Sequence, residues 1–328
     1  MKAIIINDNK KLVWSDVPDP ITGADDVLVK VHYAAVNRAD IMQCAGDYPP
    51  PDGCPDWPGL EVSGEIIKVG SGKKARKKWH VGDLVCCLLG GGGYAEYVSV
   101  RYDMCMPVPQ NCSMAEAAAL PEALATAYLK LFFEAKAQKG ETLLVTAGTS
   151  GLASVIIPLA KSYGLRVITT VRSDPAAIKH LGADIVVDTR AEKLSDVLRK
   201  EADAERGVDI AIDCLGGREA GECLQYVNYN CRWIVIASLA GDFTNIDLKN
   251  IYKKNIRIIG STLRSRPDEL KAYILSELVD KIWSKISDRE ITPTICKILP
   301  VTMAEQAHAL LVEGKNVGKV VLDVCHLN

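Results

Sequence analysis

The sequence predicts an α/β protein in which a mostly β domain is joined to a domain built on a parallel sheet. Up to about residue 110, short β-rich runs alternate with Gly, Pro and Asp. From about Pro121, strand-like runs alternate with helical segments, the pattern of βαβ units. A chain of 328 residues is also too long for one ordinary core, so two domains are expected.

The β-rich runs of the first part are typical of a folded antiparallel barrel. The run at 319–324 near the end of the chain is again strand-like, and we expect it to return to this domain. The first domain is therefore predicted to be discontinuous, with residues 1–120 and 264–328, and the second to span 121–263. The β-rich runs cover residues 27–31, 61–67 and 84–88.

Composition excludes several classes of protein. The chain is 48% apolar and 24% charged, which is typical of globular proteins. Its net charge of -2 shows no excess of basic residues of the kind that binds nucleic acid. No stretch approaches the ~20 apolar residues of a membrane-spanning helix. The basic run at 73–78 follows a Gly-Ser-Gly turn, and we expect it to be a solvated loop between strands.

The cysteines indicate a reducing compartment. They number eleven, which is odd, and no secretory segment precedes the first strand-like residues. Reduced thiols in a cytoplasmic protein are therefore expected. Cys86 and Cys87 are adjacent on a predicted strand and should point to opposite faces, where core packing is the simplest role.

The second domain is predicted to be a Rossmann domain, because six buried strands are the number in a complete dinucleotide-binding sheet. Between the first two strands, apolar residues from Leu152 to Tyr163 recur at spacings of three and four, so a helix should pack on the sheet. Pro158 is unfavourable inside that helix. The six strands are expected at 143–146, 167–170, 185–187, 210–212, 233–236 and 256–259.

A glycine-containing turn links the first strand to this helix. Its sequence, AGTSGLA at 147–153, has glycines at 148 and 151 but Ala153 at the third position of the usual fingerprint. Glycines let the backbone approach a diphosphate, and a helix N-terminus offers unpaired N–H groups. A plain strand-to-helix connection is the alternative, but the position within a run of βαβ units favours a dinucleotide site.

The end of the second strand favours NADPH over NADH. NAD-binding domains place an acid there to bind the ribose 2′-hydroxyl, whereas this chain has Arg172 and Ser173. A guanidinium suits a 2′-phosphate. Asp174, followed by Pro175, is interpreted as a helix N-cap. The alternative for Arg172 is a solvated surface arginine.

Over essentially its whole length the chain resembles the zinc-free quinone oxidoreductases of the medium-chain dehydrogenase/reductase superfamily. The resemblance implies that the β domain is a GroES-like catalytic domain and that the site lies in the cleft between the domains. It rests on VNRADIMQ at 36–43, PGLEVSG at 58–64, GGGYAEY at 91–97, ALPEA at 119–123, DCLGG at 213–217, LRSR at 263–266 and NVGK at 316–319.

Missing ligands imply that no metal is bound. Zinc-dependent relatives place a Cys within the segment 37–40 and a His at the position of Leu60, and no C-x-x-C cluster follows Tyr97. Without a metal to polarise it, the hydride acceptor must already be electrophilic. We therefore expect NADPH-dependent reduction of a quinone or similar conjugated carbonyl compound.

The resemblance also assigns site residues. Asn37, Asp40 and Tyr48 would be the polar catalytic lining, with Tyr48 orienting the quinone or, alternatively, packing on neighbouring prolines. Thr126 would contact the nicotinamide side or merely pack its helix. The remaining cofactor contacts would be Gly148, Ser150, Gly151 and Leu152 at the diphosphate, Arg172 and Ser173 at the adenosine, and Cys214, Ser238, Leu239, Leu263, Arg264, Asn316 and Lys319 around the nicotinamide and its ribose.

The adenosine contacts depart from the family pattern. The family often has Gly-Ser followed by Lys after the second strand and a Tyr after the third, where this chain has Arg172, Ser173 and Asp174, and then Thr189.

Three further expectations stay open. The substrate could instead be a 2-alkenal, an enone or an enoyl thioester. The chain could be a catalytically silent NADPH-binding protein with a structural or regulatory role. Family relatives pair through the last strand of the dinucleotide domain, so a homodimer through the apolar run 255–260 is expected.

Overall fold

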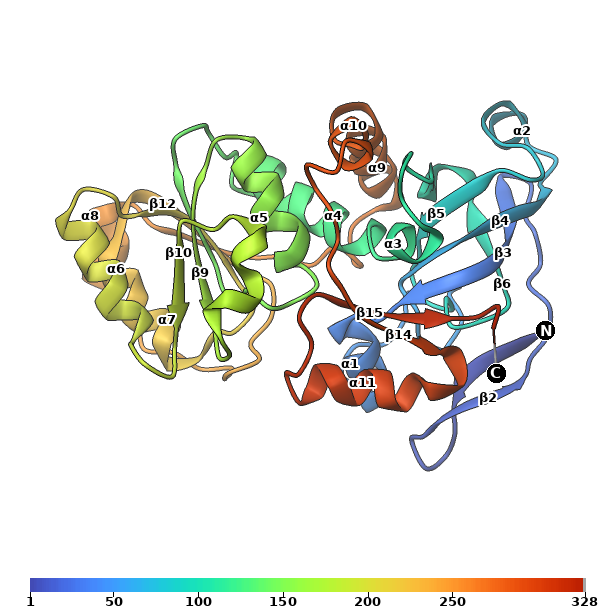
Figure 1. Ribbon diagram of the computed structural model, residues 1–328, viewed down its shortest axis with the longest axis horizontal. Coiled ribbons are helices and arrows are strands. Elements are labelled where there is room, and N and C mark those ends of the chain that lie inside the picture. Colours follow the sequence, from blue (N-terminus) through green and yellow to red (C-terminus); the bar gives the residue numbers. More distant parts are fainter. Residues whose placement is uncertain (327–328) are drawn as a thin grey trace. The chain divides into compact units, whose positions relative to one another are not determined.

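The computed structural model describes residues 1–326 and forms two compact units (Figure 1). Unit 1 contains Met1–Ala125 and the chain from Arg264 onward, and unit 2 contains Thr126–Leu263. The first boundary falls inside helix α4 (Pro121–Tyr128), rather than at its start.

Unit 2 is built on a six-stranded sheet whose strands all run parallel. The order β10-β9-β8-β11-β12-β13 is that of a dinucleotide-binding sheet. Strands β9 and β10 are added on one side of β8 and the last three on its other side, so the strand order reverses between β8 and β11. The six predicted strands are therefore confirmed. They are β8 (Thr142–Val145), β9 (Arg166–Val171), β10 (Ile185–Asp188), β11 (Val208–Asp213), β12 (Val227–Val235) and β13 (Arg257–Gly260).

Helices of unit 2 pack on this sheet through apolar side chains. Helix α5 (Ala153–Ser162) buries Val155, Ile156 and Leu159 as predicted, and it continues through Pro158. A core cluster around Trp233 joins the sheet to the remaining helices α6 (Leu194–Asp203), α7 (Gly217–Cys223) and α8 (Leu248–Lys254). A short 3-10 helix, η3 (Pro175–Leu181), follows β9, and a π-helical turn, η2 (Leu129–Glu134), continues α4.

Unit 1 is mostly β, as predicted. Its seven-stranded sheet has the order β14-β15-β3-β4-β5-β7, with β6 also paired to β3, and β1 and β2 form a separate pair. The C-terminal β15 pairs with β3, which confirms that the tail returns to this sheet. The strands are β1 (Lys2–Ile6), β2 (Leu12–Asp16), β3 (Asp26–Ala35), β4 (Glu61–Val69), β5 (Leu84–Leu88), β6 (Tyr97–Arg101), β7 (Cys105–Pro107), β14 (Ile295–Pro300) and β15 (Lys319–Asp323).

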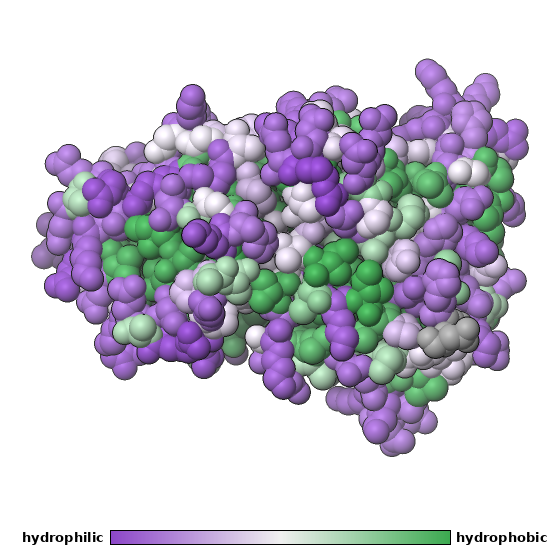
Figure 2. All heavy atoms as spheres, viewed as in Figure 1, coloured by the Kyte–Doolittle hydropathy of each residue, from purple (hydrophilic) through white to green (hydrophobic). Residues whose placement is uncertain are grey.

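The helices of unit 1 include one that the sequence analysis placed wrongly. The basic run expected to be a loop is helix α2 (Lys73–Lys78). Ala75 and Trp79, four residues apart, are both buried and give this short helix an inner face, while its basic residues are exposed. Among these, Lys78 also contacts the protein, since its Nζ donates to the carbonyl oxygen of Cys105 at 3.2 Å. Figure 2 shows hydrophilic side chains gathered over α2. The other helices are α1 (Arg38–Ala45), α3 (Met114–Ala118), α9 (Asp268–Lys281), α10 (Trp283–Ser287) and α11 (Ala304–Val312), with 3-10 turns η1 (Tyr102–Met104) and η5 (Val301–Met303).

All eleven cysteines are free thiols. Cys86 and Cys87 are fully buried in β5, which confirms their place in the core. Burial raises the pKa of both thiols well above the usual range. Within residues 1–326, no helix combines the length and apolar character needed to cross a bilayer.

Candidate cofactor and substrate site

The turn between β8 and α5 has the backbone geometry of a diphosphate-binding loop. Ala147 adopts a left-handed conformation with φ 58°, and the amide of Gly148 donates to the carbonyl oxygen of Thr170 at 2.7 Å. A Cβ at Gly148 would lie 2.6 Å from Oγ1 of Thr169. Glycine is thus required here because the turn packs directly against β9.

Three backbone N–H groups of this turn have no acceptor within residues 1–326. They belong to Thr149, Gly151 and Leu152, which flank the start of α5. The next amide, that of Ala153, is already used, because it donates to Oγ of Ser150 at 3.1 Å. Unpaired amides at a helix N-terminus form an anion site, so the turn fits a diphosphate group.

At the end of β9, the two residues predicted to bind the adenosine phosphate both carry polar groups without a partner among the described residues. Arg172 is exposed and makes no hydrogen bond or ion pair with any residue that the structure describes. The Oγ of Ser173 is buried and also has no partner in that part of the chain. Asp174 accepts from the amide of Ala176 at 2.9 Å, which confirms its capping role at η3. An unpaired guanidinium beside an unpaired hydroxyl suits a phosphate.

Asp213, which the sequence analysis quoted only as part of a motif, organises the loop that carries Cys214. Its Oδ1 accepts from the amides of Leu215 at 2.9 Å and Gly216 at 3.1 Å, and from Oγ1 of Thr146 at 3.1 Å. The predicted contacts around this loop lie together, because the amide of Leu239 donates to the carbonyl oxygen of Cys214 at 3.1 Å. The neighbouring Ser238 is exposed and bonds to Asp242.

In unit 1, Asn37 belongs to a buried charged cluster. Its Nδ2 donates to Oε1 of Glu61 at 2.9 Å, and its Oδ1 accepts from Nζ of Lys319 at 2.6 Å. Lys319 also forms an ion pair with Glu61, and the side chains of these two residues are 3% and 0% exposed. The second oxygen of Glu61 accepts from the amide of Glu122 at 2.9 Å, at the start of α4. The cluster therefore fixes the side chain of Asn37 from both ends.

Asp40 is fully buried, although the resemblance placed it in the polar lining. Its carboxylate accepts from the amides of Asn37 at 2.7 Å and Gly59 at 2.8 Å, and from the hydroxyl of Tyr94 at 3.1 Å. Burial raises the pKa of Asp40 to about 6. The Tyr94 hydroxyl also lies 3.3 Å from Nε2 of His308, whose pKa is lowered to about 4 by burial. Asp40 thus positions Asn37 through its backbone.

Tyr48 lies beside Arg264 rather than simply against prolines. The guanidinium carbon of Arg264 is 5.1 Å from the centre of the Tyr48 ring, a cation–π contact. The three guanidinium nitrogens of Arg264 also donate within unit 1, to the carbonyl oxygens of Gly90 and Tyr48 and to Oε1 of Gln43, at 2.8, 3.1 and 2.7 Å. These bonds hold the loop that carries Tyr48.

The remaining predicted residues are placed as follows. Thr126 is half-buried on α4, Leu263 is 4% exposed at the end of unit 2, and Nδ2 of Asn316 donates to the carbonyl oxygen of Gly318 at 2.8 Å. Within residues 1–326, no three His, Cys, Asp or Glu side chains form a group that could hold a metal ion.

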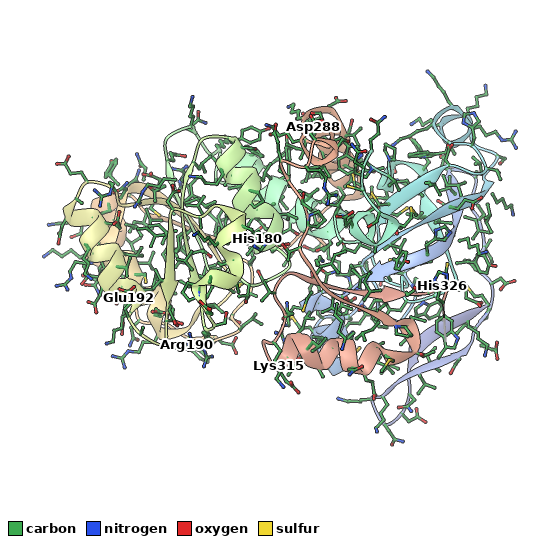
Figure 3. The ribbon with its side chains drawn as sticks, in the orientation of Figure 1. His180, Arg190, Glu192, Asp288, Lys315 and His326 are labelled. Carbon is green, nitrogen blue, oxygen red and sulfur yellow. The ribbon has the colours of Figure 1, made fainter. Side chains whose placement is uncertain are left out.

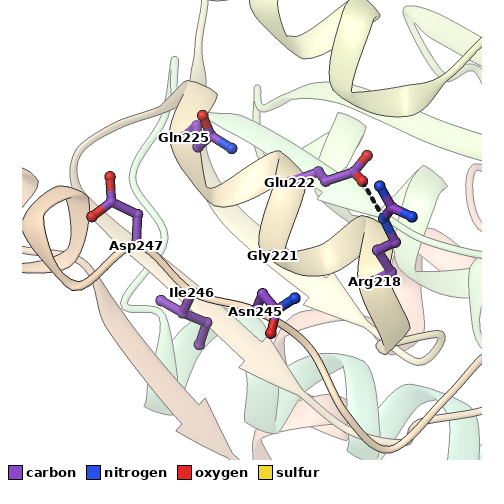
Figure 4. Close-up of a pocket in the computed structure, with 7 residues that line it drawn as sticks. All are labelled: Arg218, Gly221, Glu222, Gln225, Asn245, Ile246 and Asp247. Atoms are coloured by element: carbon purple, nitrogen blue, oxygen red, sulfur yellow. Dashed lines mark hydrogen bonds and ion pairs between the residues drawn. The ribbon is translucent and has the colours of Figure 1, made fainter.

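A separate cavity of about 340 Å³ opens beside α7 in unit 2 (Figure 4). Its polar lining includes an ion pair between Arg218 and Glu222 at 2.8 Å, and none of the predicted cofactor residues lines it. The lining residues are Arg218, Gly221, Glu222, Gln225, Asn245, Ile246 and Asp247.

Comparison with known proteins agrees with the fold and the motifs. Residues 23–110 match the family of alcohol dehydrogenase GroES-like domains, and residues 151–280 match the family described as zinc-binding dehydrogenase. The chain is 31% identical to a quinone oxidoreductase-like protein 2 homolog of Nematostella vectensis, with 98% of this chain and 88% of that protein covered. It is 30% identical to the quinone oxidoreductase of Mus musculus, with 94% and 92% covered.

Solved structures give the same result. The quinone oxidoreductase of Thermus thermophilus, described also in its complex with NADPH, superimposes with a TM-score of 0.82 at 26% identity and covers 99% of this chain and 100% of that chain. The JamJ enoyl reductase shares the fold, with a TM-score of 0.85 at 23% identity and coverage of 98% of both chains. The chain therefore belongs to the quinone oxidoreductase family of the medium-chain dehydrogenase/reductase superfamily, and it is an oxidoreductase of that superfamily.

Proposed function

We propose that this protein uses NADPH to reduce quinones or related conjugated carbonyl compounds without zinc. The observation that carries the proposal is a pair of polar features in unit 2 that lack partners among the described residues. These are the unpaired amides of the turn at 149–152 and, at the end of β9, the unpaired Arg172 and Ser173. The similarity to quinone oxidoreductases, one of which is described in its complex with NADPH, supports the same assignment.

The bound nucleotide would supply a hydride, and the chain would bind and orient it. The amides of Thr149, Gly151 and Leu152 would hold the diphosphate, and Arg172 with Ser173 would hold the 2′-phosphate. The loops at 214–216 and 238–239, which Asp213 and their mutual hydrogen bonds fix, would border the nicotinamide ribose. Rigid loops of this kind lower the entropic cost of orientation.

On the substrate side, we assign Tyr48 to the acceptor oxygen, with Asn37 as a supporting residue, because Glu61, the carbonyl oxygen of Ala35 and Lys319 already use the donors and the acceptor of its side-chain amide. Glu61 and Lys319 fix the side-chain amide of Asn37. Arg264 fixes the backbone of Tyr48 by donating to its carbonyl oxygen. Zinc independence is supported by the donor set. Leu60 stands where zinc-dependent relatives have histidine, it is only 1% exposed, and its side chain offers no ligand atom.

Steady-state rates with an NADPH saturation series test the substrate class. We expect turnover with 1,4-benzoquinone and 9,10-phenanthrenequinone that exceeds turnover with a 2-alkenal or a crotonyl thioester, and no loss of activity after treatment with a zinc chelator. A higher rate on the alkenal or thioester would favour the enone or enoyl reductase. Binding of NADPH without turnover of any acceptor would favour the silent NADPH-binding protein.

We further propose a cytoplasmic homodimer that pairs through β13. This strand is at the edge of the unit 2 sheet, and Ile258 on it is 44% exposed. Eleven free thiols fit a reducing compartment. Sedimentation at micromolar concentration should give a dimer for the wild-type chain and a monomer for Ile258→Asp. A wild-type monomer would contradict the pairing.

A further inference from the structure

The end of β10 lies directly beside the end of β9, where the proposed adenosine site is. Asp188 and Val171 are register partners, and both the amide and Oγ1 of Thr189 donate to the carbonyl oxygen of Val171, at 2.9 and 3.2 Å. The segment 188–190 is therefore held against the segment that carries Arg172 and Ser173. Neither Asp188 nor Arg190 belongs to the site predicted from the sequence.

Arg190 and Asp188 form a tightly bonded pair. Nε of Arg190 donates to Oδ1 of Asp188 at 2.9 Å, Nη2 donates to Oδ2 at 2.6 Å, and the amide of Arg190 donates to Oδ1 at 3.0 Å. The hydrogen bond from Arg190 lowers the pKa of Asp188 to about 2, so the carboxylate is charged at neutral pH. Both oxygens of this acid are thus already used.

The guanidinium of Arg190 keeps one edge free. A guanidinium has five N–H donors arranged along two usable edges, and the pair with Asp188 takes the edge formed by Nε and Nη2. The other edge, formed by Nη1 and Nη2, can bind an anion bidentately. The side chain is 56% exposed and, in Figure 3, projects from the segment after β10. Arg190 follows Thr189, which is hydrogen-bonded to Val171, and so it lies close to the 172–174 segment along the edge formed by the ends of β9 and β10.

We infer that Arg190, oriented by Asp188, binds the 2′-phosphate of the nucleotide and sets the preference for NADPH over NADH. The inference rests on the proposed function and adds a specificity residue to it. Asp188 has a second effect, because a free carboxylate near the adenosine ribose would accept a hydrogen bond from its 2′-hydroxyl and so favour NADH. In the pair with Arg190, that acid is neutralised and its oxygens are occupied.

Arg190 should contribute more to this preference than Arg172. The guanidinium of Arg190 is already oriented by two hydrogen bonds, whereas that of Arg172 has no partner within residues 1–326 and must be ordered when the ligand binds. Ordering a long, flexible side chain on binding carries an entropic cost. A preorganised arginine therefore binds the same phosphate more tightly.

The test is calorimetric titration of the full chain with four probes, NADPH, NADH, 2′,5′-ADP and 5′-AMP. Arg190→Ala should weaken binding of NADPH and of 2′,5′-ADP by about tenfold or more, since a charge-assisted bidentate contact contributes at least ~1.4 kcal/mol. The affinity for NADH and for 5′-AMP should stay unchanged or rise, because the carboxylate of Asp188 is then free to accept a hydrogen bond from the 2′-hydroxyl. Arg172→Ala should change the ratio of the NADPH and NADH affinities less than Arg190→Ala does.

Arg199→Ala is the matched control. Arg199 is also in unit 2, its side chain is 55% exposed and it too pairs with an aspartate, Asp196, but it lies on α6. The inference would be overturned if Arg190→Ala bound NADPH within twofold of wild type, or if Arg199→Ala lost as much affinity as Arg190→Ala. Either result would leave the proposed function intact. A wild-type chain that binds neither dinucleotide would instead contradict the proposed function.

Discussion

Removal of the positive charge of Lys319 should destabilise unit 1 strongly. Lys319 and Glu61 are 3% and 0% exposed, so the substitution Lys319→Met leaves a carboxylate in the core without its partner. The loss of one member of a buried ion pair costs about 3–5 kcal/mol, and Met preserves most of the aliphatic stem. We therefore expect the free energy of unfolding to fall by that amount.

Urea unfolding monitored by tryptophan fluorescence measures this effect, because four of the five tryptophans lie in unit 1. The double variant Lys319→Met/Glu61→Gln should recover at least half of the loss, since no buried charge remains and the amide oxygen can still accept from Asn37. Lys285→Ala is the control. Its ion pair with Glu290 is in the same unit but exposed, and such pairs contribute about 1 kcal/mol or less.

Two results would refute this reasoning. One is a Lys319→Met variant within about 1 kcal/mol of wild type. The other is a double variant as unstable as the single one, since the loss would then not come from an unpaired charge.

Two more predictions concern the buried acid and the glycine turn. Because burial raises the pKa of Asp40 from 3.8 to about 6, the folded chain binds more protons than the unfolded chain between these values, and stability falls as pH rises through them. The free energy of unfolding of wild type, relative to that of Asp40→Asn, should thus drop by about 2–3 kcal/mol between pH 4 and pH 7. If urea unfolding showed the same difference between the two proteins at both pH values, the raised pKa of Asp40 would be excluded. Gly148→Ala would place its Cβ 2.6 Å from Oγ1 of Thr169 and 2.8 Å from Cδ1 of Ile178, so unit 2 should lose about 1–3 kcal/mol and bind NADPH more weakly. Thermal unfolding and titration check this, and an unchanged melting temperature would count against the packing argument.

The fold could be predicted from the sequence because its signals are local. Apolar runs of strand length at 143–146 and 210–212, with an amphipathic helix after the first, define βαβ units by periodicity alone. The turn at 147–153 was recognisable for the same reason, since its glycines follow a strand and precede a helix. The structure reproduces these elements within one or two residues at the core of the sheet.

Pairings between distant residues could not be predicted in this way. Glu61 and Lys319 are 258 positions apart, and nothing in either segment states that their side chains meet. The burial of Asp40 likewise depends on Tyr94 and Gly59, which arrive from other segments. Short elements are a second limit, since two buried residues, Ala75 and Trp79, decide that a lysine-rich run is a helix.

The central claim is that the amides of the turn after β8 bind the diphosphate of NADPH. Hydrogen–deuterium exchange of a peptide covering residues 147–153 tests it most directly, because the amides of Thr149, Gly151 and Leu152 have no acceptor within residues 1–326. Saturating NADPH should slow their exchange markedly, while peptides from α2 in unit 1 stay unchanged. Unaltered exchange at 147–153 in a chain shown by calorimetry to be saturated would contradict the account.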